Sequence, residues 1–176
     1  MSLTVELGLR PVSRSPLTRF VRWFVATRFG AGLLSGRLQV LDRWALRISA
    51  GRTSFSDLFG GVPTILLTTT GARTGLPRTS QLIVVPCGDD RADLAVLGSN
   101  FGRARAPLWV SNLSADPHAV AAHRGRQVPV LAREVFGPEA DRIRADARAV
   151  YRGFVTYPEM VGERPIRIFR LSAARS

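Results

Sequence analysis

The sequence predicts a mainly β protein with flanking helices (α+β), in which about six antiparallel strands close into a small barrel or a strongly curled sheet. Three observations support this fold class. The chain has 176 residues, which suits one domain with a single core. From residue 62 onward, runs rich in β-branched residues alternate with glycine-containing turns. The connections between successive runs are short, and short connections favour antiparallel pairing.

Residues 1–61 are predicted to form a helical segment before a barrel domain that spans residues 62–176. A first helix is expected to begin at Ser15, because serine is a favoured N-cap residue and proline follows it. A second helix is expected over roughly residues 36–50. Arginines interrupt the apolar run of the first helix, so it cannot span a membrane. It could lie on an anionic membrane surface, and packing on the outside of the barrel is the alternative.

Two helices are expected among the strands of the barrel. One begins near Pro107, and the other covers residues 137–152, where Ile143, Ala147 and Val150 share an apolar face. The segments expected to be strands are residues 63–70, 78–86, 92–98, 118–123, 127–135 and 165–171.

The charge balance points to an anionic partner. All 25 basic residues are arginine, and the formal net charge is +12. A phosphorylated cofactor, an acidic lipid surface or nucleic acid would suit this charge. Nucleic-acid binding is not expected, because the arginines are dispersed and no recognised motif interleaves them with stacking aromatic residues.

The cysteine and histidine content indicates a reducing compartment and no metal site. Cys87 is the only cysteine, so an intrachain disulfide is excluded. No histidines or cysteines stand at metal-ligand spacing, and His118 and His123 are expected to be solvent-facing residues on opposite faces of a strand. No signal peptide is recognisable. We therefore expect a cytoplasmic protein, with peripheral contact at the inner face of the cell membrane as the alternative.

The turn GARTG, after the first expected strand, is the first candidate site. Arg73, Thr74 and Gly75 occupy it, and Arg78 follows shortly after. Backbone N–H groups in such a turn, together with guanidinium groups, can cradle an anion. An ordinary hairpin turn with surface arginines is the alternative.

The loop SNFGRARAP and the helix after it form the second candidate site. Gly102 allows close approach to a ligand, and the helix N-terminus near Pro107 favours negative charge. Trp109 and Asn112 share a helix face, either beside a ligand or as a core residue and a cap. The loop residues assigned to cofactor binding are Ser99, Asn100, Phe101, Gly102, Arg103, Arg105, Ala106 and Pro107.

Spaced aromatic residues form the third candidate site. Tyr151, Phe154 and Tyr157 recur every third residue, so they could line a pocket mouth or seal the barrel end. No nucleophile with its base, and no paired carboxylates, occur at a suggestive spacing. The reactive group of an enzyme with this sequence would therefore come from a cofactor.

Five stretches, taken in their order along the chain, resemble the deazaflavin-dependent nitroreductase and quinone reductase family. They are ILLTTTGARTGLPR, SNFGRARAPLWVSNLSADP, LAREVFGPEADR, the spaced aromatics and ERPIRIFRL. The resemblance covers roughly residues 62–171. It implies a split β-barrel related to flavin-binding barrels, a groove for reduced coenzyme F420, and a possible homodimer. It also implies that Arg73, Thr74 and Arg78 meet the phosphate or oligoglutamate tail of the cofactor.

The resemblance further implies that Ser99 and Asn100 begin a loop around the cofactor, and that Trp109 and Asn112 match the Pro-x-Trp-x-x-Asn-Leu pattern of the family. Departures from the family pattern lie at Ala72, Gln81-Leu82, Ile83, Val110 and Phe154. The function expected is hydride transfer from reduced F420 to a quinone, a nitro compound or an activated alkene. An FMN-dependent reductase and a non-catalytic carrier of a cofactor or apolar ligand are the alternatives. The proposed catalytic residues are Ser99, Tyr151 and Tyr157.

Overall fold

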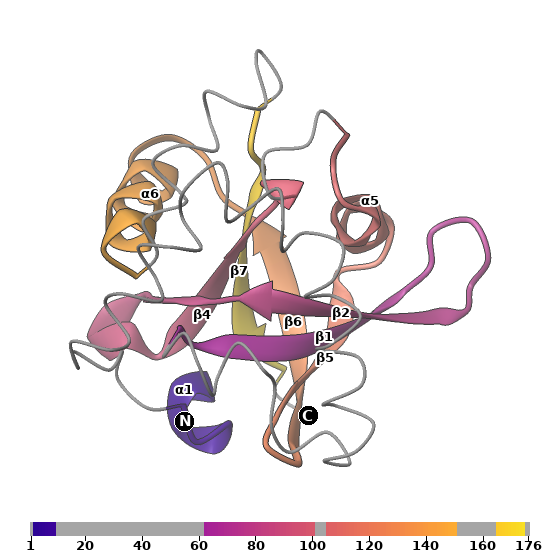
Figure 1. The fold of residues 1–176 in the computed structure, drawn as a ribbon, viewed down its shortest axis with the longest axis horizontal. Coiled ribbons are helices and arrows are strands. Elements are labelled where there is room, and N and C mark those ends of the chain that lie inside the picture. The colour runs from indigo at the N-terminus through magenta and orange to yellow at the C-terminus, as the bar shows by residue number, and fades with distance from the viewer. Residues whose placement is uncertain (1, 10–61, 101–104, 151–164, 175–176) are drawn as a thin grey trace, which may run out of the picture.

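The computed structural model describes residues 2–9, 62–100, 105–150 and 165–174. Seven antiparallel strands form one sheet in the order β2-β1-β5-β6-β7-β4-β3 (Figure 1). The predicted mainly β fold with flanking helices is confirmed, whereas the helices expected at Ser15 and over residues 36–50 lie outside the described residues. The strands are β1 (Thr64–Thr70), β2 (Pro77–Ile83), β3 (Val85–Cys87), β4 (Asp93–Leu97), β5 (His118–His123), β6 (Arg126–Glu134) and β7 (Ile168–Ala173). The α-helices of the described part are α1 (Leu3–Glu6), α5 (Leu108–Ala115) and α6 (Gly137–Val150).

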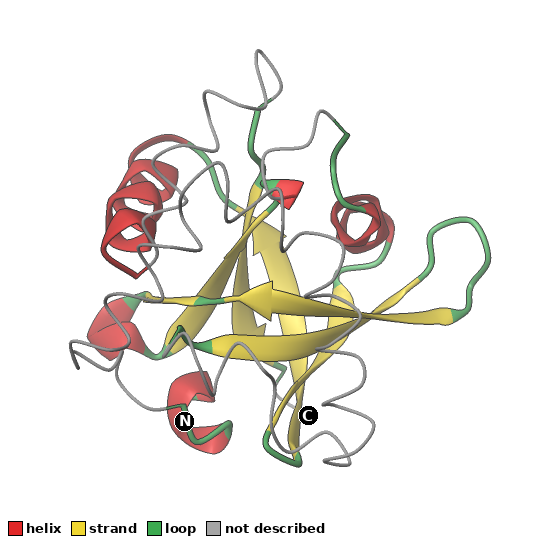
Figure 2. Cartoon of the chain, in the orientation of Figure 1, coloured by secondary structure: helices red, strands yellow, loops and turns green. Residues whose placement is uncertain are grey.

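The two edges of the sheet are joined by the chain itself. Val84 alone separates β2 from β3, although these strands stand at opposite ends of the sheet order. Its backbone N–H donates to the carbonyl oxygen of Pro63 at 3.0 Å, just before β1. The sheet therefore curls into the half-barrel seen in Figure 2. The expectation of one strand over residues 78–86 is wrong, because the chain passes at Val84 from one sheet edge to the other, and the sheet has seven strands where about six were expected.

The core has two parts, one on each face of the curled sheet. The inner face carries the larger cluster, which α5 joins through Trp109 and Leu113. The outer face of β3, β4 and β7 is covered by α6, whose predicted apolar face, Ile143, Ala147 and Val150, is confirmed. The inner cluster includes the almost fully buried side chains of Ile65, Leu67, Leu94, Val96, Val130 and Leu171.

The short helix α1 is a feature that no sequence pattern indicated. Leu3 and Leu7 are fully buried in the inner cluster. The N–H of Thr4 donates to the carbonyl oxygen of Ala92 at 3.4 Å, which joins α1 to the start of β4. In the view of Figure 1, α1 lies below the sheet and α5 above it. The described N-terminal residues thus fill the end of the barrel away from α5.

The expectation for the histidines is partly wrong. They lie on opposite faces of β5, as expected, and His118 is exposed. His123, however, is buried, and its Nδ1 lies 2.9 Å from the carbonyl oxygen of Thr64. Cys87 is buried too, and this burial raises the pKa of its thiol to about 12. The thiol therefore stays protonated near neutral pH, and a protonated thiol is unreactive.

Candidate functional site

The turn between β1 and β2 uses most of its backbone N–H groups internally. Gly71 N–H donates to the carbonyl oxygen of Leu76 at 2.9 Å, and Thr74 and Gly75 both donate to that of Gly71, at 3.1 and 2.7 Å. With Ala72 bonded to a side chain and Leu76 to the Thr74 hydroxyl, five of the six N–H groups from residue 71 to residue 76 are engaged. The expected backbone cradle for an anion is therefore largely absent, and the arginine side chains are left as the anion-binding groups of the turn.

The conformation of this turn requires glycine at two positions. A Cβ on Gly71 would stand 2.8 Å from Thr74 Oγ1 and 3.0 Å from the carbonyl oxygen of Leu76. Gly75 has φ +65°, in the left-handed region that favours glycine. No heavy atom lies within 4 Å of the position of its absent Cβ. The turn is therefore compact at its base and open to a ligand at Gly75.

Asn112 joins this turn to α5. Its side chain is buried, and its Nδ2 donates to Thr69 Oγ1 at 3.0 Å. Its Oδ1 accepts a hydrogen bond of 3.0 Å from the backbone N–H of Ala72. One carboxamide thus contacts the end of β1 and the turn beyond it. The structure places Asn112 as a buried bridge between two candidate segments.

The second candidate segment begins where β4 ends. Gly98 N–H donates to the carbonyl oxygen of Arg167 at 2.8 Å, and Ser99 is buried. Asn100 has φ +49°, and its Nδ2 donates to the carbonyl oxygen of Arg105 at 2.9 Å. The bond between Asn100 and Arg105 brings together the two described ends of the loop, one on each side of residues 101–104.

Helix α5 follows this loop, as predicted, and Pro107 directly precedes its first residue. Trp109 points into the inner cluster, where its ring meets that of Phe169 edge to face, with centroids 5.9 Å apart and planes at 70°. Trp109 is only 5% exposed, whereas Leu108 is 78% exposed. Trp109 therefore supports the site from the core, and Leu108 and Pro107 form the part of the helix start that a ligand could reach.

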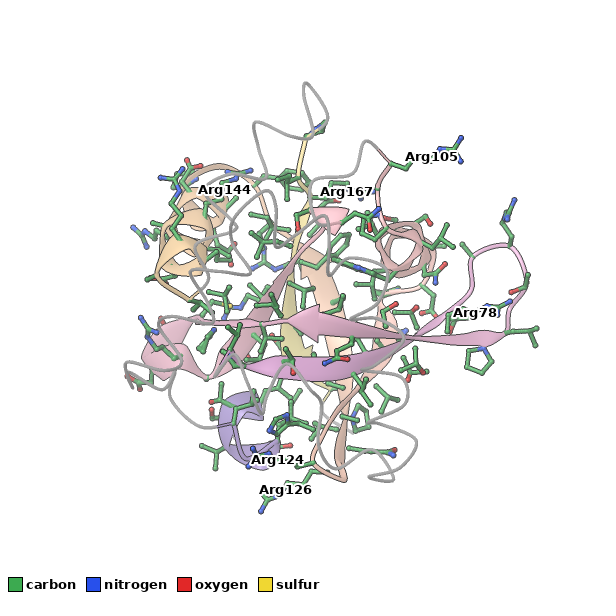
Figure 3. The ribbon with its side chains drawn as sticks, viewed as in Figure 1. Arg78, Arg105, Arg124, Arg126, Arg144 and Arg167 are labelled. Atoms are coloured by element: carbon green, nitrogen blue, oxygen red, sulfur yellow. The ribbon has the colours of Figure 1, made fainter. Side chains whose placement is uncertain are left out.

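Three arginines of the two segments carry charge without a partner in the described structure. Arg73, Arg78 and Arg105 are exposed, and none forms an ion pair with a described residue. In Figure 3, Arg78 and Arg105 lie on the side of the molecule that carries α5 and the β1–β2 turn, away from Arg144 on α6. Unpaired guanidinium groups on neighbouring segments suit phosphate and carboxylate ligands.

Several arginines elsewhere on the barrel are paired with carboxylates. Arg170 donates from Nε to Asp93 Oδ2 at 2.7 Å and from NH1 to Glu139 Oε1 at 3.1 Å. Arg133 also donates to both oxygens of Glu139, at 2.8 and 3.0 Å. This network joins β4, β6 and β7 to the first turn of α6. These paired arginines hold the fold together. Arg124, Arg126, Arg142 and Arg148 are exposed and form no ion pair with a described residue, so the candidate site is distinguished by unpaired arginines on two segments that α5 connects.

Acid is expected to destabilise the fold through Glu134 and Glu139. Hydrogen bonds from Arg167 hold the pKa of Glu134 below its ordinary value of 4.5, and those from Arg133 lower the pKa of Glu139. A carboxylate with a lowered folded pKa stabilises the fold fully above its unfolded pKa and loses that contribution as the pH falls through the lowered value. Urea midpoints measured from about pH 6 to about pH 3 should therefore fall below about pH 4.5. The Glu134→Gln variant should show a smaller fall, and an equal fall would contradict this account.

Several predicted site residues lie outside the described residues. They are Phe101, Gly102, Arg103, Tyr151, Phe154 and Tyr157. The sequence reasoning also missed residues that the structure brings to the site. Arg167, just before β7, contacts both Glu134 at the end of β6 and Ser114 on α5. No local spacing connects them, so only the fold reveals the cluster.

Residues 41–172 match the family described as F420H(2)-dependent quinone reductase. The match covers more than half of the chain, and the chain belongs to this family. It begins within the segment expected to precede the barrel. The predicted family is confirmed, and its description names reduced F420 and gives no support to FMN.

Known relatives agree with this assignment. An F420H(2)-dependent quinone reductase of Mycobacterium tuberculosis is 34% identical over 85 residues, which are 48% of this chain and 55% of that protein. The chain thus spans about half the length of the curated relatives it matches. A solved F420-H2-dependent reductase, FDR-A, is 28% identical with a TM-score of 0.55, covering 62% of this chain and 94% of that one.

A second solved structure, described as a domain-swapped dimer, is 27% identical with a TM-score of 0.57, covering 74% of this chain and 95% of that one. The curled antiparallel sheet is accordingly of the split-barrel type found in F420-dependent reductases. In the part of the chain that the structure describes, no helix has the length and apolar character needed to cross a membrane.

Proposed function

We propose that this protein is a reductase that uses reduced F420 and transfers a hydride to an electron-poor acceptor, with a quinone as the preferred class. The observation that carries the proposal is the position of Arg73, Arg78 and Arg105, which no described acidic residue neutralises, on the turn and the loop that flank α5. Two segments supply these arginines, and α5 connects the segments through Asn112. Membership of the F420H(2)-dependent quinone reductase family supports both the cofactor and the acceptor.

The residues present fit an elongated anionic cofactor. Arg73, Thr74 and Arg78 would hold its phosphate or oligoglutamate tail, because guanidinium groups form charge-assisted hydrogen bonds with such oxygens. The open space at Gly75 admits such a group to the turn. Arg105 would contact the cofactor from the second segment. The other proposed contacts of this segment are Ser99, Asn100, Phe101, Gly102, Arg103, Ala106 and Pro107, with Trp109 and Asn112 behind them.

When bound, reduced F420 supplies a hydride, and a quinone that takes up this hydride and one proton becomes a hydroquinone. The protein contributes orientation, exclusion of water and hydrogen bonds to the negative charge that develops on the acceptor. Ser99, the first residue of the loop, is 6% exposed and is one proposed donor. Tyr151 and Tyr157 are the other two.

The acceptor class and the carrier alternative can be separated by one panel of assays. Turnover of a quinone by the F420-loaded protein supports the proposed activity. A preference for a nitro compound or an activated alkene would change the acceptor class. Binding of F420 without turnover of any acceptor would favour a non-catalytic carrier.

The quaternary structure and membrane contact are also proposals. The similar domain-swapped dimer supports a homodimer, which light scattering of the purified protein tests. Contact with an anionic membrane through the segment before residue 36 is tested by vesicle sedimentation of the chain with and without that segment.

Replacing Arg73 or Arg105 with glutamine is expected to weaken F420 binding. Each exposed charge contributes modestly, so the Kd from F420 fluorescence should rise roughly two- to fivefold per substitution at moderate salt. High salt should reduce the difference, because it screens exposed charges. Arg144→Gln is the matched control, since Arg144 is an arginine on the other side of the molecule and its ion-pair partner among the described residues is Asp141. Equal effects at Arg73 and Arg144 would show that net charge, and not this site, attracts the cofactor.

A further inference from the structure

Arg167, just before β7, contacts three parts of the chain around the candidate site. Its carbonyl oxygen accepts the hydrogen bond of 2.8 Å from Gly98 N–H at the start of the loop. Its Nε donates to Glu134 Oε1 on β6 at 2.6 Å, and its NH2 bonds the other carboxylate oxygen. The same NH2 donates to Ser114 Oγ on α5 at 2.9 Å. One residue thus holds the loop, the helix and the sheet together.

The geometry of this contact is directional. The Nε and NH2 groups of Arg167 each donate to one carboxylate oxygen of Glu134. These two hydrogen bonds fix the plane of the Arg167 guanidinium group. The head group also lies over the ring of Phe169, 5.3 Å from its centroid. The side chains of Arg167 and Glu134 remain 37% and 20% exposed. An ion pair this accessible to water adds little stability, so its main effect is on the placement of the groups it joins.

Gly98, directly before the loop, has little freedom to move independently of α5. A Cβ on Gly98 would stand 2.8 Å from Val110 Cγ2 of α5 and 3.3 Å from the carbonyl oxygen of Arg167. The backbone of Gly98 is therefore closely packed between the helix and Arg167. A shift of Arg167 would carry Ser99 and Asn100 with it, because Gly98 directly precedes them.

We propose that Arg167, held by Glu134, is the positioning residue of the cofactor site, which sets the loop of residues 98–100 against α5. The proposal rests on the proposed function for the identity of the ligand. Arg167 acts through the loop and the helix and makes no contact with the reacting atoms. A conservative replacement by lysine should not restore this role. The single ammonium group of lysine cannot hold Glu134 with a planar fork and reach Ser114 in the same arrangement.

The test compares Arg167→Gln, Arg167→Lys and Ser114→Ala with the control Arg133→Gln. Arg133 forms a similar two-oxygen pair with Glu139, but this pair lies at α6 and not at the loop. Three quantities are measured for each variant of the full chain. They are the Kd for F420 from fluorescence, the hydrogen-exchange rate of the Gly98 amide in the cofactor-free protein, and the urea midpoint of unfolding.

Arg167→Gln should raise the Kd about tenfold and accelerate Gly98 exchange by a similar factor. Arg133→Gln should leave both unchanged. Compared with Arg167→Gln, Arg167→Lys should return the urea midpoint closer to its unsubstituted value than it returns the Kd. If the role of Arg167 were purely structural, lysine would return the urea midpoint and the Kd to the same extent. Ser114→Ala removes only the α5 contact, so it should give a smaller change in the same direction, and it serves as the test variant should Arg167→Gln not fold.

Unchanged binding and unchanged Gly98 exchange in Arg167→Gln would overturn the positioning role while leaving the proposed function intact. Failure of the unsubstituted protein to bind F420 would instead overturn the proposed function. Gly98 exchange alone would then decide whether Arg167 holds the loop, because that measurement needs no cofactor.

Discussion

Replacing Asn112 with alanine is expected to lower the free energy of unfolding by about 2–4 kcal/mol and to weaken F420 binding. The substitution removes both partners that the carboxamide supplies, at Thr69 Oγ1 and at the N–H of Ala72. Thr69 is only 2% exposed, so water cannot readily replace the lost bond there. Unsatisfied groups near the protein interior are costly, because they give up hydration without a replacement.

The effect on binding follows from the position of the bridge. Asn112 fixes α5 relative to the turn that carries Arg73, so its loss should allow the two arginine-bearing segments to separate. Urea unfolding gives the stability, and F420 fluorescence gives the Kd.

Ser111→Ala is the matched control for Asn112→Ala. Ser111 is an exposed residue of the same helix, and its hydroxyl donates only to the carbonyl oxygen of Leu108. Its loss should change stability by less than about 0.5 kcal/mol. A second variant, Thr69→Val, removes one arm of the bridge and leaves Ala72 bonded. Equal stability and equal Kd for Asn112→Ala and Ser111→Ala would contradict the bridging role.

The sequence was informative wherever an element carries its own periodicity. The apolar spacing of α6 predicted the face that packs on the sheet, and the β-branched run of β1 predicted a strand. No local sequence pattern shows that the chain crosses from one edge of the sheet to the other at Val84. The apolar residues 82–85 continue from the end of β2 into β3 without a break, and only the pairing of each strand with a different neighbour, β1 or β4, separates the two strands.

In the candidate site too, features with a local sequence pattern could be predicted, whereas contacts between distant segments could not. The turn between β1 and β2 and the start of α5 lie where the sequence placed them, because glycine and proline mark these points in the sequence. The use of the turn N–H groups could not be predicted, since it depends on a side chain from α5 that lies far along the chain. Arg167, Glu134 and Ser114 were missed for the same reason, because they come together only in the folded chain.

Trp109→Ala is expected to be the most destabilising substitution, with a loss of about 3–5 kcal/mol in the free energy of unfolding. The indole is 5% exposed and lies in the inner cluster. Its removal leaves a cavity and ends the edge-to-face contact with Phe169, the ring beneath the Arg167 guanidinium. Because this contact also supports Arg167, the substitution should disturb the loop of residues 98–100 as well as the core.

Trp109→Phe provides the graded comparison. Phenylalanine keeps a ring that can meet Phe169 but fills less of the cluster, so its loss of stability should be clearly smaller than that of alanine. Circular dichroism during urea unfolding measures both variants without relying on tryptophan emission, to which Trp23 and Trp44 also contribute. If α5 caps the barrel through Trp109, the free energy of unfolding must be highest with tryptophan at position 109, lower with phenylalanine and lowest with alanine. An alanine variant as stable as the unsubstituted protein would mean that α5 is anchored elsewhere, and Asn112 would then be the principal remaining attachment of the helix to β1.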